Sequence, residues 1–130
     1  MTINSFQGEH EFLSNEYPCR IYMGGYTFGS VEHALHASKT LSVDERMEVR
    51  GCTSIEEVRK LSEKLTLRHD WDQVRNESLR RFLSQKFFGN EDLKKKLLAT
   101  GEVPITGETE NEQLLGSMLM EIRNNLRKNN

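Results

Sequence analysis

The chain has 130 residues and a mass of 15.1 kDa, which is about the size of one domain. Hydrophobic residues make up 35 % and charged residues 29 % of the sequence, which is too apolar for a disordered chain and too polar for a membrane protein. Eighteen basic side chains against twenty acidic ones give a net charge of −2, so this is not a protein that wraps a nucleic-acid backbone without regard to sequence.

The cysteines and the apolar runs bear on the cellular compartment. Cys19 and Cys52 lie far apart and outside any C-x-x-C pattern, so we expect reduced thiols rather than a disulfide framework or a zinc site. The first ten residues lack the basic start and apolar stretch of a signal peptide. No apolar run approaches the roughly 20 residues of a membrane-spanning helix. We therefore expect a cytoplasmic protein that does not associate with membranes.

Residues 1–29 are expected to be extended, with turns and one hairpin. Residues 20–23 and 26–28 are mainly apolar and flank Gly24 and Gly25. Paired glycines allow the positive φ values that a tight hairpin turn needs. The sequence therefore predicts a small sheet near the N-terminus.

Helices are expected over most of the remaining chain. Capping side chains such as Ser30, Asp70 and Asn90 precede segments whose apolar residues recur at helical spacing. Pro104 limits residues 103–106 to a short edge strand, because proline cannot donate to a central ladder. The fold class predicted is therefore α+β, a helix-dominated single domain over residues 1–130. The expected helices span residues 30–40, 43–50, 53 or 54 to 65, 70–88, 90–101 and 112–127.

The first candidate site lies between residues 29 and 39. Glu32, His36 and Lys39 are spaced i, i+4, i+7 and therefore share one face of a helix. A carboxylate in the first turn of a helix, directly after a hairpin, can meet a ligand beside the sheet. Alternatively, Glu32 serves only the helix dipole, and His33 and His36 are ordinary histidines. Because no third ligand accompanies these two histidines, we expect no metal and no cofactor.

The second candidate site is the segment of residues 68–72. The single tryptophan, Trp71, can stack on a planar base, with Asp72 as a hydrogen-bond acceptor or general base. Alternatively, Trp71 anchors its helix to the core and Asp70 caps that helix. Glycine-rich phosphate loops, the nucleophile elbow of the hydrolases and an activated cysteine have no counterpart in the sequence.

Several segments, in order along nearly the whole chain, resemble the motifs of one family. They are residues 12–15 (F-L-S-N) with 17–18 (Y-P), 26–34 (Y-T-F-G-S-V-E-H-A), 70–75 (D-W-D-Q-V-R), 86–87 (K-F), 97–101 (L-L-A-T-G) and 114–123 (L-L-G-S-M-L-M-E-I-R). The chain is similar in these segments to the NADAR superfamily, whose best-known members are the YbiA-like N-glycosidases.

The resemblance implies a compact α+β domain that hydrolyses the N-glycosidic bond of a phosphoribosyl or ADP-ribosyl compound. The substrate would be a phosphorylated intermediate of riboflavin synthesis or ADP-ribose attached to guanine in nucleic acid. Glu32 and Trp71 fall on active-site positions of the family. A carboxylate can stabilise the positive charge that develops on the sugar, and an indole can stack on the leaving group. The residues expected to bind substrate are Ser14, Asn15, Ser30, His33, His36 and Asp72.

The resemblance lapses within residues 101–116. Relatives carry a longer stretch there, with a D-x-x-W-G motif whose aspartate is a third active-site acid, whereas this segment has neither Asp nor Trp. Glu108, Glu110 and Glu112 are available in its place, and His36 stands where the family usually has Gln. Three functions therefore stay open: an N-glycosidase, a non-catalytic module that binds ADP-ribose or NAD, and a protein-interaction module. The partner expected for the first two is a small nucleotide-like or phosphoribosyl molecule, or ADP-ribosylated nucleic acid; the oligomeric state is left open.

Overall fold

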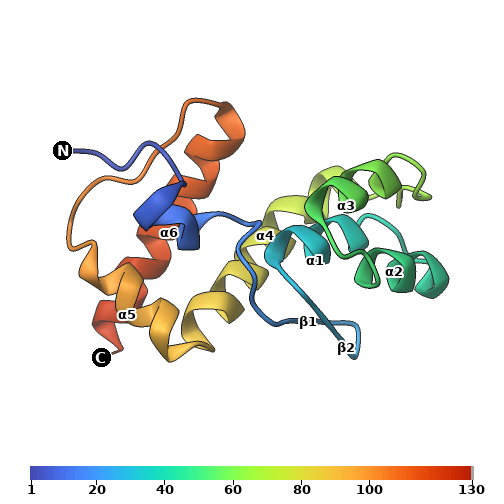
Figure 1. Cartoon of the computed structure of the whole chain (residues 1–130), viewed down its shortest axis with the longest axis horizontal. Coiled ribbons are helices and arrows are strands. Elements are labelled where there is room, and N and C mark those ends of the chain that lie inside the picture. Colours follow the sequence, from blue (N-terminus) through green and yellow to red (C-terminus); the bar gives the residue numbers. More distant parts are fainter. Residues whose placement is uncertain (130) are drawn as a thin grey trace. The chain divides into compact units, whose positions relative to one another are not determined.

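A computed structural model describes residues 1–129 (Figure 1). The chain forms two compact units. The terminal unit combines Met1–Tyr17 with the chain from Leu83 onward, and the hairpin unit is Pro18–Phe82. In chain order the elements are η1 (Gly8–Leu13, a 3-10 helix), β1 (Ile21–Met23), β2 (Tyr26–Phe28), α1 (Val31–Ala37), α2 (Val43–Arg50), α3 (Ile55–Ser62), α4 (Trp71–Phe88), α5 (Glu91–Ala99) and α6 (Glu110–Lys128).

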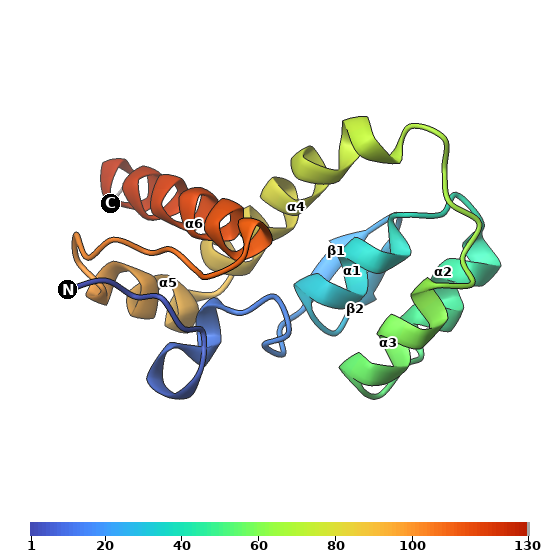
Figure 2. The same ribbon diagram turned by 90° about the horizontal axis from the view of Figure 1, so that it is seen from above.

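The hairpin unit is built around α1. Strands β1 and β2 pair antiparallel, with Ile21 opposite Phe28, and Gly24 and Gly25 turn the chain at φ values of 61° and 88°. Helix α1 contacts this hairpin and both α2 and α3, which lie beside it in Figure 2. Helices with a small antiparallel sheet near the N-terminus confirm the predicted fold class. The buried apolar side chains around α1 are Ile21, Phe28, Val31, Ala34, Leu35, Val49 and Val58.

The terminal unit packs α5 against α6. Residues 103–106, predicted as a short edge strand, form one isolated parallel bridge between Ile105 and Ile3. The N–H of Ile3 donates to the carbonyl of Pro104 at 2.8 Å, and the N–H of Thr106 donates to the carbonyl of Ile3 at 2.9 Å. The apolar residues that recur at helical spacing in α6 are all buried: Leu115, Met118, Leu119, Ile122 and Leu126.

The predicted starts of the helices are more accurate than their ends, although α6 begins at Glu110, two residues before the predicted residue 112. Side chains of Ser30, Ser54 and Asn90 cap α1, α3 and α5, as expected, and Ser54 rather than Thr53 is the N-cap of α3. Helices α1 and α3 end about three residues earlier than predicted. Their last turns close with tighter i to i+3 hydrogen bonds, such as the one from the Lys39 N–H to the His36 carbonyl at 3.1 Å.

Residues 1–29 were predicted to be extended, with turns and one hairpin. That prediction is wrong for Gly8–Leu13, which forms the 3-10 helix η1. Gly8 enters it at a φ of 59°, which glycine adopts without strain. The helix buries Phe12 and Leu13 at its end. Six residues are too few to show a helical period in sequence, so the burial of these two side chains decides the conformation.

Gly116 of α6 provides a test of this packing. A Cβ atom at this position would lie 2.8 Å from the carbonyl carbon of Ile105 and 2.9 Å from Cα of Thr106, and closer still to the carbonyl oxygen of Ile105. Backbone atoms cannot rotate away as a side chain can. We therefore expect Gly116→Ala to lower the free energy of unfolding by about 2 kcal/mol, although alanine is the better helix former.

Chemical denaturation measures this difference, with Ser117→Ala as the matched control on the same helix. Ser117 is exposed, so its replacement should leave stability within about 0.5 kcal/mol of the wild type. Equal stabilities of Gly116→Ala and Ser117→Ala would contradict the close approach of α6 to residues 105–106.

Candidate functional site

Glu32 stands in the first turn of α1 because Ser30 fixes where that helix begins. The hydroxyl oxygen of Ser30 accepts a hydrogen bond from the N–H of His33 at 3.1 Å, and the backbone of Ser30 is extended. This is the geometry of an N-cap. The cap thereby sets the direction in which α1 presents Glu32, His36 and the following Lys39.

The predicted shared face of Glu32, His36 and Lys39 is present in the structure, and α3 completes it. Nε2 of His36 lies 2.9 Å from Oε1 of Glu32, and Nδ1 of His36 lies 2.7 Å from Oγ of Ser62. Nζ of Lys39 donates to the same Ser62 oxygen at 2.7 Å. Nη2 of Arg59 lies 3.8 Å from Oε2 of Glu32. We call these five residues the Glu32 cluster.

Two members of the Glu32 cluster, Arg59 and Ser62, were not predicted. They lie on α3, one turn apart, and belong to no motif in the sequence. Their role follows from the packing of α1 against α3. The helical periodicity of residues 55–61 predicts a helix. It does not predict which side chains of other helices the polar residues of this helix will contact.

The electrostatics of the Glu32 cluster keep the Glu32 carboxyl group ionised. Burial alone would raise the pKa of Glu32, because it penalises the charged form. The hydrogen bond and the electrostatic interaction with His36, together with the positive charges of Arg59 and Lys39, outweigh burial, so the pKa lies below its ordinary value of 4.5. Burial also lowers the pKa of Lys39, against the attraction of Glu32.

Ser30 and His33, both predicted to bind substrate, are engaged within the protein. Nδ1 of His33 lies 2.7 Å from the Ser30 hydroxyl oxygen, and Nε2 lies 3.1 Å from the carbonyl oxygen of Cys52. Ser30 is 1 % exposed. In this arrangement the two side chains hold the start of α1 against the end of α2, and substrate contact by either one stays a prediction.

The loop before α4 is hydrogen-bonded at two places to other segments of the hairpin unit. Glu45 of α2 accepts hydrogen bonds from the backbone N–H and the hydroxyl group of Thr66, both at 2.9 Å. The N–H of Arg68 donates to the carbonyl of Lys39 at 2.7 Å. The start of α4, with Trp71 as its first residue, therefore lies next to the segment that follows α1 (Figure 2).

Trp71 is buried, with 7 % of its surface exposed, whereas Asp72 is exposed. Asp70 begins α4 through its backbone carbonyl, while its carboxylate pairs with Arg68 at 2.6 and 3.0 Å. The hydrogen bond from Arg68 lowers the pKa of Asp70. Trp71 and Glu32 belong to the same compact unit, and within residues 1–129 no hydrogen bond or ion pair joins them. A role for Trp71 or Asp72 in the site stays a prediction.

Ser14 and Asn15 belong to the terminal unit. The carbonyl of Ser14 accepts a hydrogen bond at 2.7 Å from Nζ of Lys86, a residue that is 1 % exposed. The hydroxyl oxygen of Ser14 accepts from the N–H of Glu16. Oδ1 of Asn15 is buried and has no hydrogen-bond partner among the described residues. A buried acceptor of this kind is suited to a ligand donor.

The glutamates that could replace the family's third acid differ in their surroundings. Glu112 is engaged by Thr109, the N-cap of α6. The Thr109 hydroxyl oxygen accepts from the N–H of Glu112 at 3.1 Å, and the hydroxyl group donates to Oε1 of Glu112 at 3.2 Å. Glu108 and Glu110 are exposed. Glu112 therefore has a structural task, and no contact of Glu108 or Glu110 marks either as an acid of the site.

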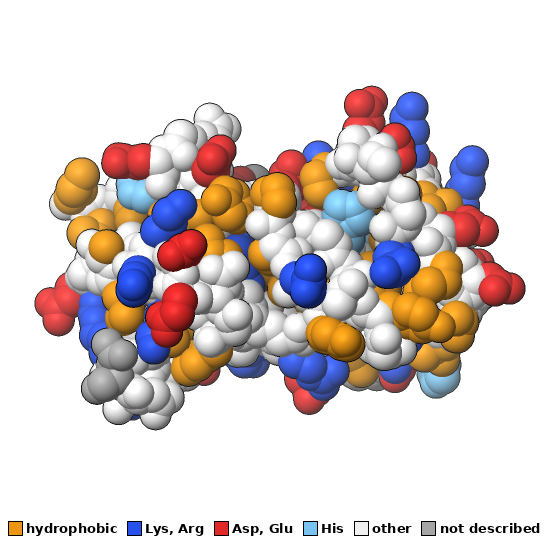
Figure 3. All heavy atoms as spheres, turned by 60° about the horizontal axis from the view of Figure 1, so that its bottom comes forward, with side chains coloured by type: hydrophobic (Ala, Val, Ile, Leu, Met, Phe, Trp, Pro, Cys, Tyr) orange, Lys and Arg blue, Asp and Glu red, His pale blue; other side chains and the backbone are white. Residues whose placement is uncertain are grey.

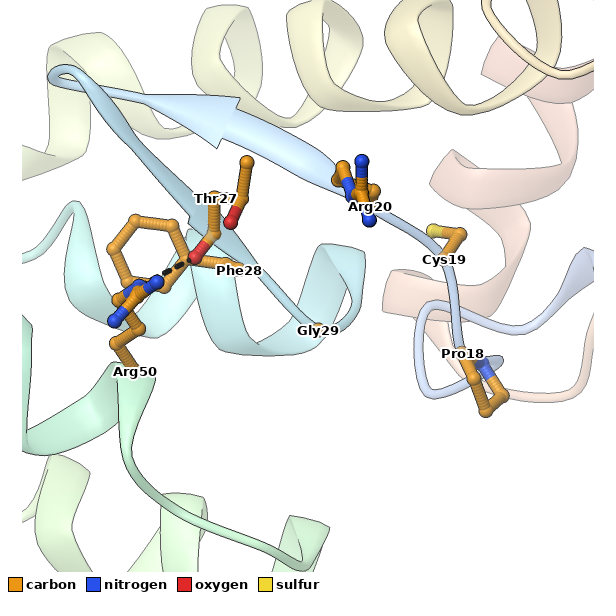
Figure 4. A pocket seen from close by; sticks show the side chains of 7 residues that line it. All are labelled: Pro18, Cys19, Arg20, Thr27, Phe28, Gly29 and Arg50. Atoms are coloured by element: carbon orange, nitrogen blue, oxygen red, sulfur yellow. Dashed lines mark hydrogen bonds between the residues drawn. The ribbon is translucent and has the colours of Figure 1, made fainter.

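An open hollow of about 630 Å³ lies beside the hairpin, directly before the start of α1 (Figure 4). Arg20 and Arg50 line it, and Nε of Arg50 donates to the carbonyl of Thr27 at 2.8 Å. The guanidinium of Arg50 also lies 6.0 Å from the centre of the Tyr26 ring. Two guanidinium groups make the lining of this hollow positively charged.

Among residues 1–129, no three His, Cys, Asp or Glu side chains are grouped so that they could hold a metal ion. None of the described helices has the length and apolar character needed to cross a bilayer. No disulfide joins Cys19 and Cys52 in the described part of the chain. Acidic and basic side chains are interspersed over the face in Figure 3.

The chain belongs to the NADAR domain family, whose family model matches residues 3–114. It is 31 % identical to a riboflavin biosynthesis protein of Vibrio vulnificus, over 92 % of this chain and 36 % of that protein, so it spans about a third of that relative. It is 29 % identical to the N-glycosidase YbiA of Escherichia coli, over 82 % of this chain and 75 % of YbiA. The NMR structure of E. coli YbiA matches with a TM-score of 0.83 at 26 % identity, covering 99 % of this chain and 85 % of that one.

The lowered pKa of Glu32 predicts how the stability of the chain responds to pH. A carboxyl group whose pKa is lower in the folded state contributes stability above its unfolded pKa, and that contribution is lost as the pH falls through the folded pKa. Wild type should therefore be more stable than Glu32→Gln at pH 7, and the difference should shrink as the pH falls below the ordinary value of 4.5.

Urea denaturation at several pH values measures this difference. Glu48→Gln is the control, because Glu48 is exposed on α2, and its difference from wild type should be small and nearly independent of pH. A stability difference between wild type and Glu32→Gln that stays constant from pH 7 to pH 3.5 would show that the charge of Glu32 contributes nothing.

Proposed function

We propose that this chain is an N-glycosidase that hydrolyses the N-glycosidic bond of a phosphoribosyl or ADP-ribosyl compound, with Glu32 as the catalytic carboxylate. The observation that carries the proposal is a half-buried, ionised carboxylate held in a fixed direction by His36, in a member of the NADAR domain family. The relatives named N-glycosidase YbiA support the reaction type.

The chemistry of N-glycoside cleavage suits such a carboxylate. As the bond between sugar carbon and base nitrogen lengthens, positive charge develops on the ribose ring. A preorganised anion near the ring stabilises that charge without having to reorient during the reaction. The same carboxylate can orient the water that attacks the sugar carbon. The low pKa of Glu32 favours these roles over that of a general acid, which must carry a proton.

The surroundings of Glu32 suit a substrate that carries phosphate. Lys39 and Arg59 lie in the Glu32 cluster, and Arg75 of α4 acts on Lys39 through its charge. Cationic side chains around one carboxylate attract an anionic ligand while the carboxylate is directed at the sugar. Both phosphorylated riboflavin precursors and ADP-ribosyl compounds have this charge.

A second candidate function is a non-catalytic module that binds ADP-ribose or NAD. The observation that favours it is the segment of residues 101–116, which has no aspartate to act as the third acid of the family. Glu112, one of the three available replacements, is held by Thr109, the N-cap of α6. Binding would then persist without hydrolysis, since ligand recognition does not require the missing acid.

Replacement of Glu32 tests the catalytic proposal. Wild type should release ribose 5-phosphate from phosphoribosylamino riboflavin precursors, or free ADP-ribose from ADP-ribosylated guanine. Glu32→Gln keeps the size of the side chain and removes its charge, so we expect the rate to fall by at least roughly 100-fold. Product release is measured by chromatography, with Glu48→Gln as the exposed control. A Glu32→Gln protein that hydrolyses these substrates as fast as wild type would exclude Glu32 as the catalytic group.

The single tryptophan gives a direct measure of ligand binding. Because Trp71 is the only indole in the chain, fluorescence excited at wavelengths that tyrosine does not absorb reports on this residue. If the base of the ligand stacks on Trp71, titration with ADP-ribose should quench the emission in a saturable way. Calorimetry under the same conditions gives the affinity independently. Saturable heat with unchanged emission would place the ligand away from Trp71, and saturable binding without any hydrolysis would favour the second candidate function.

A further inference from the structure

Ser62 lies at the centre of a directed chain of hydrogen bonds that ends at Glu32. The ammonium group of Lys39 can only donate, so Ser62 Oγ accepts from it at 2.7 Å. The hydroxyl proton of Ser62 is then available for Nδ1 of a neutral His36 ring, also 2.7 Å away. The ionised Glu32 can only accept, so Nε2–H of His36 donates to its Oε1 at 2.9 Å. Each group therefore donates to the next, from Lys39 to Glu32.

The two oxygens of Glu32 are held differently. Oε1 receives the short bond from His36, and the side chains of Glu32 and His36 are both only 16 % exposed. Oε2 faces Nη2 of Arg59 at 3.8 Å, and the side chain of Arg59 is 57 % exposed. A long contact to an exposed arginine constrains an oxygen less than a short bond from a half-buried imidazole. The carboxylate is therefore fixed through Oε1.

We propose that His36, Ser62 and Lys39 are positioning residues that fix Glu32 through Oε1 and leave Oε2 as the oxygen that faces the developing positive charge. The inference rests on the proposed role of Glu32 as the catalytic carboxylate. Ser62 is the decisive member, because it joins the imidazole of α1 to the ammonium group and lies on a different helix. Without its hydroxyl group the His36 ring loses the partner of Nδ1 and with it a defined orientation.

The charges that surround His36 come from three helices. Glu32 lies on α1 and Lys39 follows that helix, Arg59 lies on α3, and Arg75 of α4 acts on Lys39. A titration of Glu32 therefore reports on the whole cluster, and the hydrogen bond from His36 is one named contribution to it. Removing that hydrogen bond should move the pKa of Glu32 up, toward its ordinary value.

The first test measures this titration and needs no substrate. The ¹³C chemical shift of the Glu32 carboxyl carbon is followed against pH by NMR in wild type, Ser62→Ala and Ser62→Thr. We expect a higher pKa of Glu32 in Ser62→Ala and a value near that of wild type in Ser62→Thr, which keeps a hydroxyl group. Ser117→Ala, on the exposed face of α6, is the matched control and should leave the titration unchanged.

His36 variants separate orientation from charge. His36→Gln keeps an N–H that can donate to Glu32 and an oxygen that can accept from Ser62, whereas His36→Leu keeps neither. The pKa of Glu32 should therefore rise more in His36→Leu than in His36→Gln. Thermal melts show that each variant is folded before it is compared. If Ser62→Ala and His36→Leu both titrate Glu32 as wild type does, the hydrogen-bond chain does not act on Glu32 and the inference is overturned.

The second test measures kinetics on the substrate of the proposed reaction. A residue that only positions the catalytic carboxylate should change kcat and leave KM nearly unchanged. We expect Ser62→Ala to lower kcat roughly tenfold, with recovery in Ser62→Thr. An unchanged kcat in Ser62→Ala would overturn the inference. It would leave the proposed function intact, because that function is tested separately by the activity of Glu32→Gln. If the variants alter the titration of Glu32 but the wild-type protein hydrolyses none of the substrates, the positioning chain is supported and the proposed function is refuted.

Discussion

The hydrogen bond between His36 and Glu32 is the interaction on which the candidate site depends. It joins two side chains one helical turn apart, and both are largely removed from solvent. Burial would otherwise favour the neutral carboxylic acid, which could not stabilise a cationic sugar. With the imidazole, Arg59 and Lys39 nearby, the carboxylate stays charged in a place where water screens it little. Charge and low exposure together make Glu32 suited to catalysis.

The hairpin unit is organised so that this hydrogen bond forms. Ser30 fixes the first residue of α1, and His33 links that cap to the carbonyl of Cys52 at the end of α2. Helix α3 also packs against α1, and its Ser62 contacts His36 in the last turn of that helix. Polar side chains that resemble ligand-binding groups in sequence are thus partly used to hold α1. A fixed helix end is a requirement for a directed carboxylate, so this structural use and the proposed function are compatible.

His36 stands where the resemblance to the NADAR motifs predicts glutamine. A glutamine would offer an N–H donor to Glu32 but carries no charge and has no titratable group. An imidazole supplies the donor and also a second nitrogen, which Ser62 occupies. The segment of residues 101–116 is the other departure from the motifs, and there Glu112 is held by Thr109, the N-cap of α6. The two departures therefore fall next to Glu32 and in the segment that leads into α6.

The sequence by itself determined the fold class, the hairpin, the starts of α1 to α5 and the shared face of Glu32, His36 and Lys39. These follow from local rules: paired glycines, capping side chains and a period of 3.6 residues act within a few positions of the chain. The tertiary structure alone decided that Gly8–Leu13 is helical, that residues 103–106 form a single bridge and that Ser62 completes the Glu32 cluster. Each of these depends on packing or hydrogen bonding between segments distant in sequence, and no local pattern specifies which distant group will be the partner.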